Sequence, residues 1–180
     1  MSQIRSLQLK PLNAASLAIP GGDPWLVGAV DPAISVMTDF HERSAVTVAD
    51  QSPIDAALDH MKHAGVRAAF VLDETRKQVL GIITAYDIQG EKPIRHLQAV
   101  GCTHRTCSRD DVLVHDIMEK VEHWQAADVK DVERATVGEV METMRATGRT
   151  HIAVVEKVNG QGERLRGLFS AAKIMRLLRD

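Results

Sequence analysis

The chain contains two copies of one unit, and this internal repeat constrains its fold more than any other feature. Residues 81–87 read GIITAYD and residues 167–173 read GLFSAAK, so a glycine, an apolar run and a hydroxyl side chain recur in the same order. Further upstream, Gly65 in the first copy corresponds to Gly148 in the second. Each copy is therefore predicted to be one supersecondary unit that buries its apolar face against the other.

Local patterns predict the order β-α-β-β-α in each copy. In the first copy we expect strands at residues 46–48, 68–72 and 79–83, a helix that stops at Gly65 and a second helix from Ala85. In the second copy we expect strands at residues 126–129, 152–155 and 165–169, a helix that stops at Gly148 and a second helix over residues 171–178. A unit of roughly 55 residues is too small to bury a good core alone. The predicted fold class is therefore α/β (α+β), with tandem repeats packed in pseudo-two-fold symmetry.

The first helix of each copy carries start signals. In the first copy, Ser52 is predicted to be the N-cap, with Pro53 at the first helical position and Asp55 completing a capping box. In the second copy, Thr136 and Glu139 are predicted to form the corresponding capping box.

These patterns divide the chain into four parts. We expect an N-terminal extension over residues 1–32, a first repeat over residues 33–90, a connector over residues 91–112 and a second repeat over residues 113–180. In the second repeat, residues 159–162 are expected to make a longer hairpin loop than the first repeat has. Trp25 and Trp124 are expected to anchor connecting segments.

Composition excludes several classes of protein. Hydrophobic residues make up 44% of the chain but aromatic residues only 3%, which argues against a stacking platform for single-stranded nucleic acid. A net charge of −2 and a pI near 6.4 lack the basic excess of a nucleic-acid binder. No run approaches the ~18 apolar residues of a membrane span, and no secretory signal is recognisable. We expect a cytoplasmic protein that binds neither nucleic acid nor membrane.

The end of the repeat carries the candidate chemistry. Thr84 follows an apolar strand, and Asp87 comes three residues later, where a helix begins. Hydroxyl and backbone N–H groups suit a phosphate, and a carboxylate can accept both ribose hydroxyls. The alternative is that Asp87 simply caps its helix. In the second copy, Ser170 keeps the hydroxyl but Lys173 replaces the carboxylate.

Two cysteines, Cys102 and Cys107, lie close together in the connector. They form no disulfide framework, and a reducing compartment makes them ordinary loop cysteines. One alternative is a metal site, with His96 and His115 as further ligands, although the spacing matches no standard zinc motif. Another alternative is a redox-responsive pair.

The ordered series of motifs resembles the CBS domain, the cystathionine β-synthase-type motif. The series includes VTV at residues 46–48, SPI at 52–54, FVLD at 70–73 and VLGIITAYDI at 79–88. It recurs from Thr136 through residues 167–174, so the resemblance covers about residues 33–180. It implies a tandem pair, the Bateman module, with two clefts between its copies.

The resemblance also implies a function. Such modules bind AMP, ADP, ATP or S-adenosylmethionine and regulate another protein without doing chemistry themselves. The implied protein is not an enzyme, requires no cofactor and forms a homodimer, commonly through its helices. Its regulated partner is unidentified. The alternative is a structural or protein-interaction module with degenerate clefts that bind no nucleotide.

The resemblance assigns ligand-binding positions in both copies. Asp87 corresponds to the ribose-binding acid, Thr84 to the phosphate-facing hydroxyl, and Tyr86 lies between them. The remaining positions of the first copy are Arg67 and Ala68 at the start of the middle strand, Ser52 before the first helix and Thr47 on the first strand; those of the second copy are Thr150, His151 and Ser170. Lys173 leaves two alternatives, an empty cleft or a lysine that reaches a phosphate in the neighbouring cleft, because an ammonium cannot accept ribose O–H groups.

Overall fold

The computed structural model describes residues 26–75, 78–102, 107–158 and 162–179. The expected N-terminal extension, with Trp25, therefore lies mostly outside the described residues, as does most of the hairpin loop at residues 159–162. None of the helices in the described part of the chain combines the length and apolar character needed to cross a bilayer.

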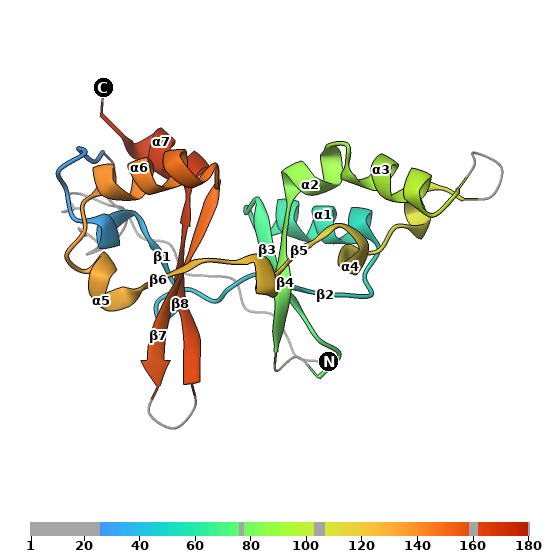
Figure 1. The fold of residues 1–180 in the computed structure, drawn as a ribbon, viewed down its shortest axis with the longest axis horizontal. Helices are drawn as coiled ribbons and strands as arrows, with labels where there is room; N and C mark the ends of the chain where they lie inside the picture. Colours follow the sequence, from blue (N-terminus) through green and yellow to red (C-terminus); the bar gives the residue numbers. More distant parts are fainter. Residues whose placement is uncertain (1–25, 76–77, 103–106, 159–161, 180) are drawn as a thin grey trace, which may run out of the picture.

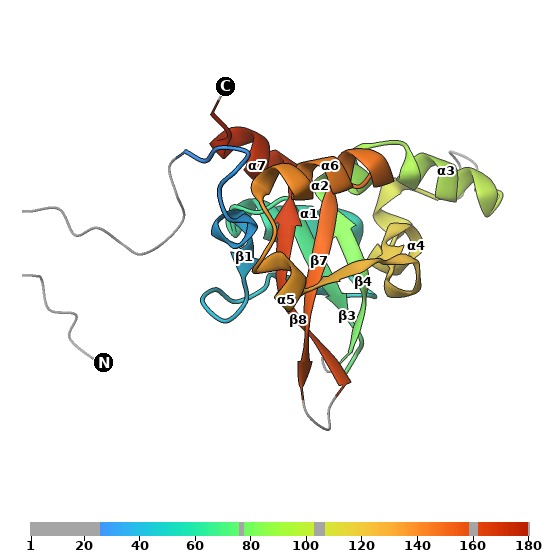
Figure 2. The same cartoon turned by 60° about the vertical axis from the view of Figure 1, so that its left-hand side comes forward.

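Each half of the chain folds as β-α-β-β-α, which confirms the predicted repeat. The first half consists of β2 (Thr47–Ala49), α1 (Ile54–His63), β3 (Ala68–Leu72), β4 (Val79–Thr84) and α2 (Ala85–Gln89). The second half consists of β6 (Ala126–Asp128), α6 (Val137–Thr147), β7 (His151–Val158), β8 (Gly162–Ser170) and α7 (Ala171–Leu177). In both halves the first strand is parallel to the second, and the second and third form an antiparallel hairpin. Figures 1 and 2 show the helices of both halves on one side and the two hairpin tips pointing away from them.

Shorter elements precede the first half, connect the two halves and follow the first strand of the second half. Before β2 lie η1 (Ala33–Val36) and β1 (Thr38–Asp39). Between α2 and β6 lie α3 (Lys92–Ala99), η2 (Arg109–Asp111), α4 (Val114–Ile117), β5 (Glu119–Lys120) and η3 (Val121–His123), and α5 (Val129–Val132) follows β6. The sequence predicted a connector here but not the helix α3.

The two halves exchange short segments. β1 pairs with β8 of the second half, and β5 pairs with β4 of the first half, so the sheets have the orders β1-β8-β7-β6 and β2-β3-β4-β5. We call residues 27–39 and residues 112–120 the exchanged segments. Each segment lies beside the half that is distant from it in the chain.

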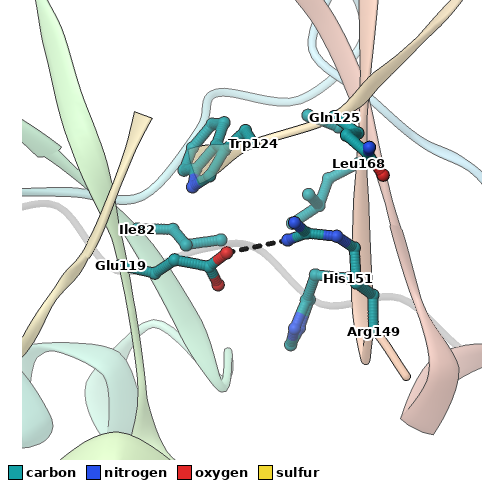
Figure 3. Close-up of a pocket in the computed structure, with 8 residues that line it drawn as sticks. Ile82, Glu119, Trp124, Gln125, Arg149, His151 and Leu168 are labelled. Atoms are coloured by element: carbon teal, nitrogen blue, oxygen red, sulfur yellow. Dashed lines mark hydrogen bonds and ion pairs between the residues drawn. The ribbon is translucent and has the colours of Figure 1, made fainter. Parts of the chain in front are cut away.

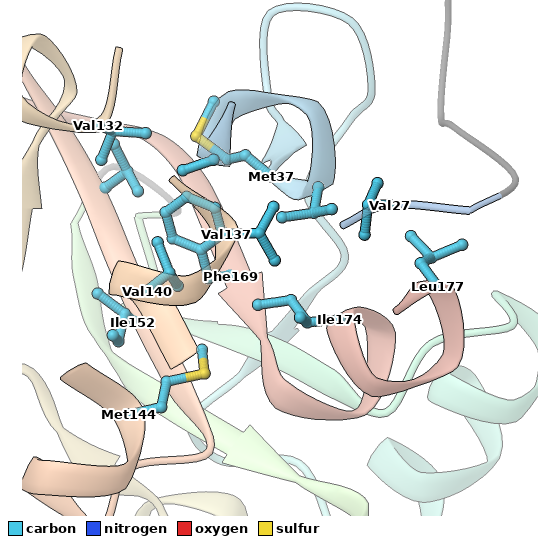
Figure 4. Close-up of a cluster of buried hydrophobic side chains, with 13 residues drawn as sticks. Val27, Met37, Val132, Val137, Val140, Met144, Ile152, Phe169, Ile174 and Leu177 are labelled. Carbon is cyan, nitrogen blue, oxygen red and sulfur yellow. The ribbon is translucent and has the colours of Figure 1, made fainter. Parts of the chain in front are cut away.

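The exchanged segments complete the two hydrophobic cores. Val27, Val36 and Met37 pack with Phe169 and other residues of the second half, as Figure 4 shows for the labelled side chains. Val112, Val114 and Ile117 pack in the same way into the core of the first half. Each buried aliphatic side chain contributes roughly 1.5–3 kcal/mol, so the exchange holds the two halves together.

The predicted start of α1 is wrong. Pro53, not Ser52, is the N-cap residue, and it makes no side-chain capping bond to the described helix. Instead, the Ile54 N–H donates to the carbonyl of Val112 at 3.1 Å, so the second exchanged segment satisfies an orphan donor of the helix. The carboxylate of Asp55 accepts from Arg109 Nε at 3.1 Å rather than closing a capping box.

The other helix signals are confirmed. The Thr136 hydroxyl and the Glu139 carboxylate cap α6 reciprocally. Gly65 and Gly148 end their helices with φ values of 67° and 66°, which a glycine adopts without steric cost.

The expectation of ordinary loop cysteines is wrong, because Cys102 and Cys107 form a disulfide. The bond closes the segment that follows α3, and its intervening residues 103–106 lie outside the described residues. The local spacing of two cysteines does not reveal whether the chain turns back on itself, so the sequence left this pairing open.

Candidate functional site

The candidate site begins at the corner between β4 and α2. The Asp87 Oδ2 atom accepts two hydrogen bonds from Thr84, one from its backbone N–H at 2.8 Å and one from its hydroxyl at 2.7 Å. The Asp87 N–H donates back to the Thr84 hydroxyl at 3.2 Å. Thr84 is buried, and the Asp87 side chain is 17% exposed. The capping interpretation of Asp87 is therefore correct as far as Oδ2 is concerned.

The other oxygen of Asp87 faces the connector. Lys92 Nζ lies 2.7 Å from Asp87 Oδ1 and also donates to the carbonyl of Ile117 at 3.3 Å. Lys92 is the first residue of α3, outside both repeats, and nothing in the sequence signalled its role. Only the packing of α3 against the first half brings it to this carboxylate.

The start of β3 lies beside this corner. Ala68 pairs with Thr84 across the hairpin, and the Arg67 carbonyl accepts from the Ala85 N–H at 2.9 Å. The Arg67 guanidinium donates to the Tyr86 hydroxyl at 3.3 Å. The structure therefore brings together all five of these predicted residues of the first copy.

The second copy has the same geometry. His151 pairs with Ser170, and the Thr150 carbonyl accepts from the Ala171 N–H at 2.9 Å. Lys173 Nζ donates to the carbonyl of Met37, in the first exchanged segment, at 3.4 Å. This half of the molecule thus has an ammonium group where the first half has the carboxylate of Asp87.

Two predicted residues lie apart from these corners. Thr47 is exposed on β2 and pairs with Phe70, two residues further along β3 than Ala68. Ser52 lies beyond the opposite end of β2, where its carbonyl accepts from the Val114 N–H at 2.9 Å. The structure does not bring Ser52 to the corner that holds Thr84 and Asp87.

A small pocket of about 20 Å³ lies between the two halves. Figure 3 shows it bridged by an ion pair in which Arg149 Nη1 lies 2.7 Å from Glu119 Oε1. Arg149 also donates to the carbonyl of His123 at 2.7 Å. The lining residues come from both halves: Ile82, Glu119, Trp124, Gln125, Arg149, His151, Ala153 and Leu168.

His151 links this pocket to the Asp87 corner. Burial lowers the pKa of His151 below its ordinary value, and the nearby carboxylates of Asp87 and Glu119 oppose that shift. The first predicted corner and a predicted residue of the second copy therefore share one electrostatic environment.

Trp124 contributes a polar atom to the pocket wall. Its indole Nε1 is buried and finds no hydrogen-bond partner among the described residues. Its ring packs on Phe70 with 5.9 Å between ring centroids. A buried N–H without an acceptor costs about 1–3 kcal/mol, and this atom is too enclosed to reach a ligand in the structure as it stands.

Of the residues that line the pocket, the sequence identified His151 alone. Glu119 comes from the second exchanged segment. This segment directly precedes the second half in the chain, but it packs against the first half. Arg149 directly precedes the predicted residues Thr150 and His151. This neighbourhood was the one sequence signal that could have identified Arg149 as a site residue. Trp124 was expected only to anchor a connecting segment.

The metal alternative receives no support. Among the residues that the structure describes, no group of three or more His, Cys, Asp or Glu residues could hold a metal ion. Both nominated histidines instead lie near a carboxylate: Asp116 is 3.6 Å from His96 and 3.0 Å from His115. The two cysteines, also nominated, are bonded to each other.

Comparison with known families gives two matches along the chain. A family model described as CBS domain matches residues 35–91 and, again, residues 132–180. Together these segments cover more than half of the chain. None of the curated proteins compared with the chain matches it.

Solved structures share the fold at low sequence identity. A CBS-domain containing protein from Agrobacterium tumefaciens is 21% identical, with a TM-score of 0.54, over 90% of this chain and 98% of that one. An uncharacterised conserved protein from Pyrococcus horikoshii is 20% identical, with a TM-score of 0.54, over 82% of this chain and 91% of that one. CBSX2, a CBS-pair protein from Arabidopsis thaliana, was solved in complex with AMP; it is 17% identical, with a TM-score of 0.52, over 82% of this chain and 94% of that one.

Proposed function

The chain belongs to the CBS domain family, and from this premise we propose that it is a regulatory module that binds an adenosine-containing nucleotide between its two repeats. AMP, ADP, ATP and S-adenosylmethionine are the candidate ligands. The ligand acts as a regulator of an unidentified partner protein, and the module itself carries out no reaction.

The observation that carries this proposal is the corner at the start of α2, where Asp87, Thr84 and Tyr86 lie beside the start of β3. A ribose needs a carboxylate, and the charge of Asp87 acts on the imidazole of His151 in the second repeat. Trp124 Nε1 is a further hydrogen-bond donor that an opened pocket would offer to such a ligand. The complex of CBSX2 with AMP supports the choice of ligand class by analogy.

The pocket must open for a nucleotide to enter. Its volume of about 20 Å³ is far below the ~300–1,000 Å³ of typical small-molecule sites. The Glu119–Arg149 ion pair crosses the pocket between the two halves, so its separation would widen the entrance. Ligand binding is then expected to shift the population toward a more open arrangement of the repeats.

Thermal unfolding tests the proposal. A ligand that binds only the native state raises the melting temperature, and at 100 times its Kd it adds about 2.7 kcal/mol of stability. We expect AMP, ADP, ATP or S-adenosylmethionine to raise the melting temperature by several degrees, with inorganic phosphate as the control. A flat response to all four would contradict the proposal and favour a structural module with degenerate clefts.

We also propose that the module forms a homodimer through its helical side. Tyr86 on α2 and Met175 on α7 are 61% and 63% exposed, although both are large and apolar in character. Figure 1 shows both helices on the same side of the two sheets. Sedimentation velocity should give a dimer, and Met175→Glu should shift it toward monomer. A wild-type monomer at every concentration would contradict this.

A further inference from the structure

Asp87 has too few acceptor sites available for a ribose in the structure as it stands. A carboxylate offers about four lone-pair sites, and three are used here. Oδ2 receives both hydrogen bonds from Thr84, at 2.7 and 2.8 Å, and Oδ1 receives the ammonium of Lys92 at 2.7 Å. A ribose with two hydroxyl donors needs two sites on the outward oxygen, and Lys92 occupies one of them.

The Lys92 side chain is free to move away from Asp87. Its side chain is 47% exposed, and its flexible four-carbon stem carries a compact charge with three donors. Asp87, in contrast, is held in place by the capping box at the start of α2. When the two groups separate, Lys92 is therefore the one that moves.

The second half also places an ammonium group against an exchanged segment. Lys173 Nζ donates to the carbonyl of Met37 in the first exchanged segment, and Lys92 Nζ donates to that of Ile117, one residue before the equivalent of Met37, in the second. In the second half the lysine occupies the position that corresponds to Asp87 itself. In the first half Lys92 is joined to the carboxylate of Asp87, so a ligand there can exchange one partner for another.

We infer that Lys92 is a specificity-determining residue, which leaves Asp87 when the ribose binds and pairs with the 5′-phosphate of the same ligand. This inference rests on the proposed function. The exchange disfavours a bare nucleoside, because its ribose displaces the ammonium and offers no anion in return. A nucleotide supplies the phosphate, so the charge of Lys92 stays paired.

The test compares adenosine with AMP by calorimetry in wild type, Lys92→Met and Lys92→Gln. Both variants should bind adenosine more tightly and AMP more weakly, so the preference for AMP should fall by roughly tenfold or more. Lys92→Arg should retain the preference, because it keeps the charge. Lys130→Met removes one exposed lysine from α5 and is the matched control, with no expected change.

The possible outcomes separate this inference from the proposed function. If wild type binds AMP and the preference is the same in both Lys92 variants, the inference is wrong and the proposed function stands. If Lys92→Met binds adenosine and wild type does not, the displacement of Lys92 is supported. If neither protein binds any adenosine compound, both the inference and the proposed function fail.

Discussion

Replacing Asp87 with alanine is expected to weaken AMP binding by roughly 100-fold. The change removes the acceptor of two ribose hydroxyl groups, and each hydrogen bond to a charged group contributes about 1.5–3 kcal/mol. The same change leaves the ammonium of Lys92 without its partner at 2.7 Å. Titration calorimetry with AMP and with 2′-deoxy-AMP measures the effect, and the variant should no longer distinguish the two ligands.

The control for this prediction is the capping box of a different helix. Asp87→Ala also breaks the capping box of α2, which costs about 1 kcal/mol of stability on its own. Glu139→Ala breaks the capping box of α6, and Glu139 does not line the pocket. We expect Glu139→Ala to lower stability by a similar amount and to leave AMP binding unchanged. If Asp87→Ala binds AMP as wild type does, the carboxylate is a helix cap and nothing more.

Sequence alone could predict the architecture because its signals are local and occur twice. The Thr136–Glu139 capping box and the turn glycines Gly65 and Gly148 depend on neighbours within a few residues. The same is true of the helix cap at Asp87, which was the alternative to ribose binding and which the structure shows as a hydrogen bond from Thr84. Short-range chemistry of this kind is readable from the order of residues.

What the sequence could not predict depends on contacts between distant segments. The repeat identifies Met37 and Met118 as equivalents, but no local pattern says which sheet either one covers. The start of α1 shows the same limit: Ser52 fits an N-cap, yet the backbone of Val112 satisfies the helix instead. Lys92, whose ammonium group pairs with one oxygen of the Asp87 carboxylate, lies outside both repeats, and no sequence pattern identifies it.

The exchange of segments makes a second large effect predictable, this time on stability. A Cβ atom built on Gly81 in β4 would lie 2.4 Å from the carbonyl oxygen of Glu119 in β5. A backbone atom of a paired strand cannot move aside as a flexible side chain can. Gly81→Ala should therefore cost about 3 kcal/mol, at the upper end for overpacking, and lower the melting temperature by roughly 6–12 °C.

Two other glycines serve as comparisons for this prediction. Gly167 is equivalent to Gly81, and a Cβ there would lie 2.8 Å from the carbonyl oxygen of Thr38, so Gly167→Ala should cost a similar amount. Gly28 has no neighbour closer than 3.8 Å, and Gly28→Ala should stay within about 1 kcal/mol of wild type. Equal stability of all three variants and wild type would contradict the pairing of β1 with β8 and of β5 with β4. The two halves would then not exchange segments, and Glu119 would not lie across the pocket from Arg149.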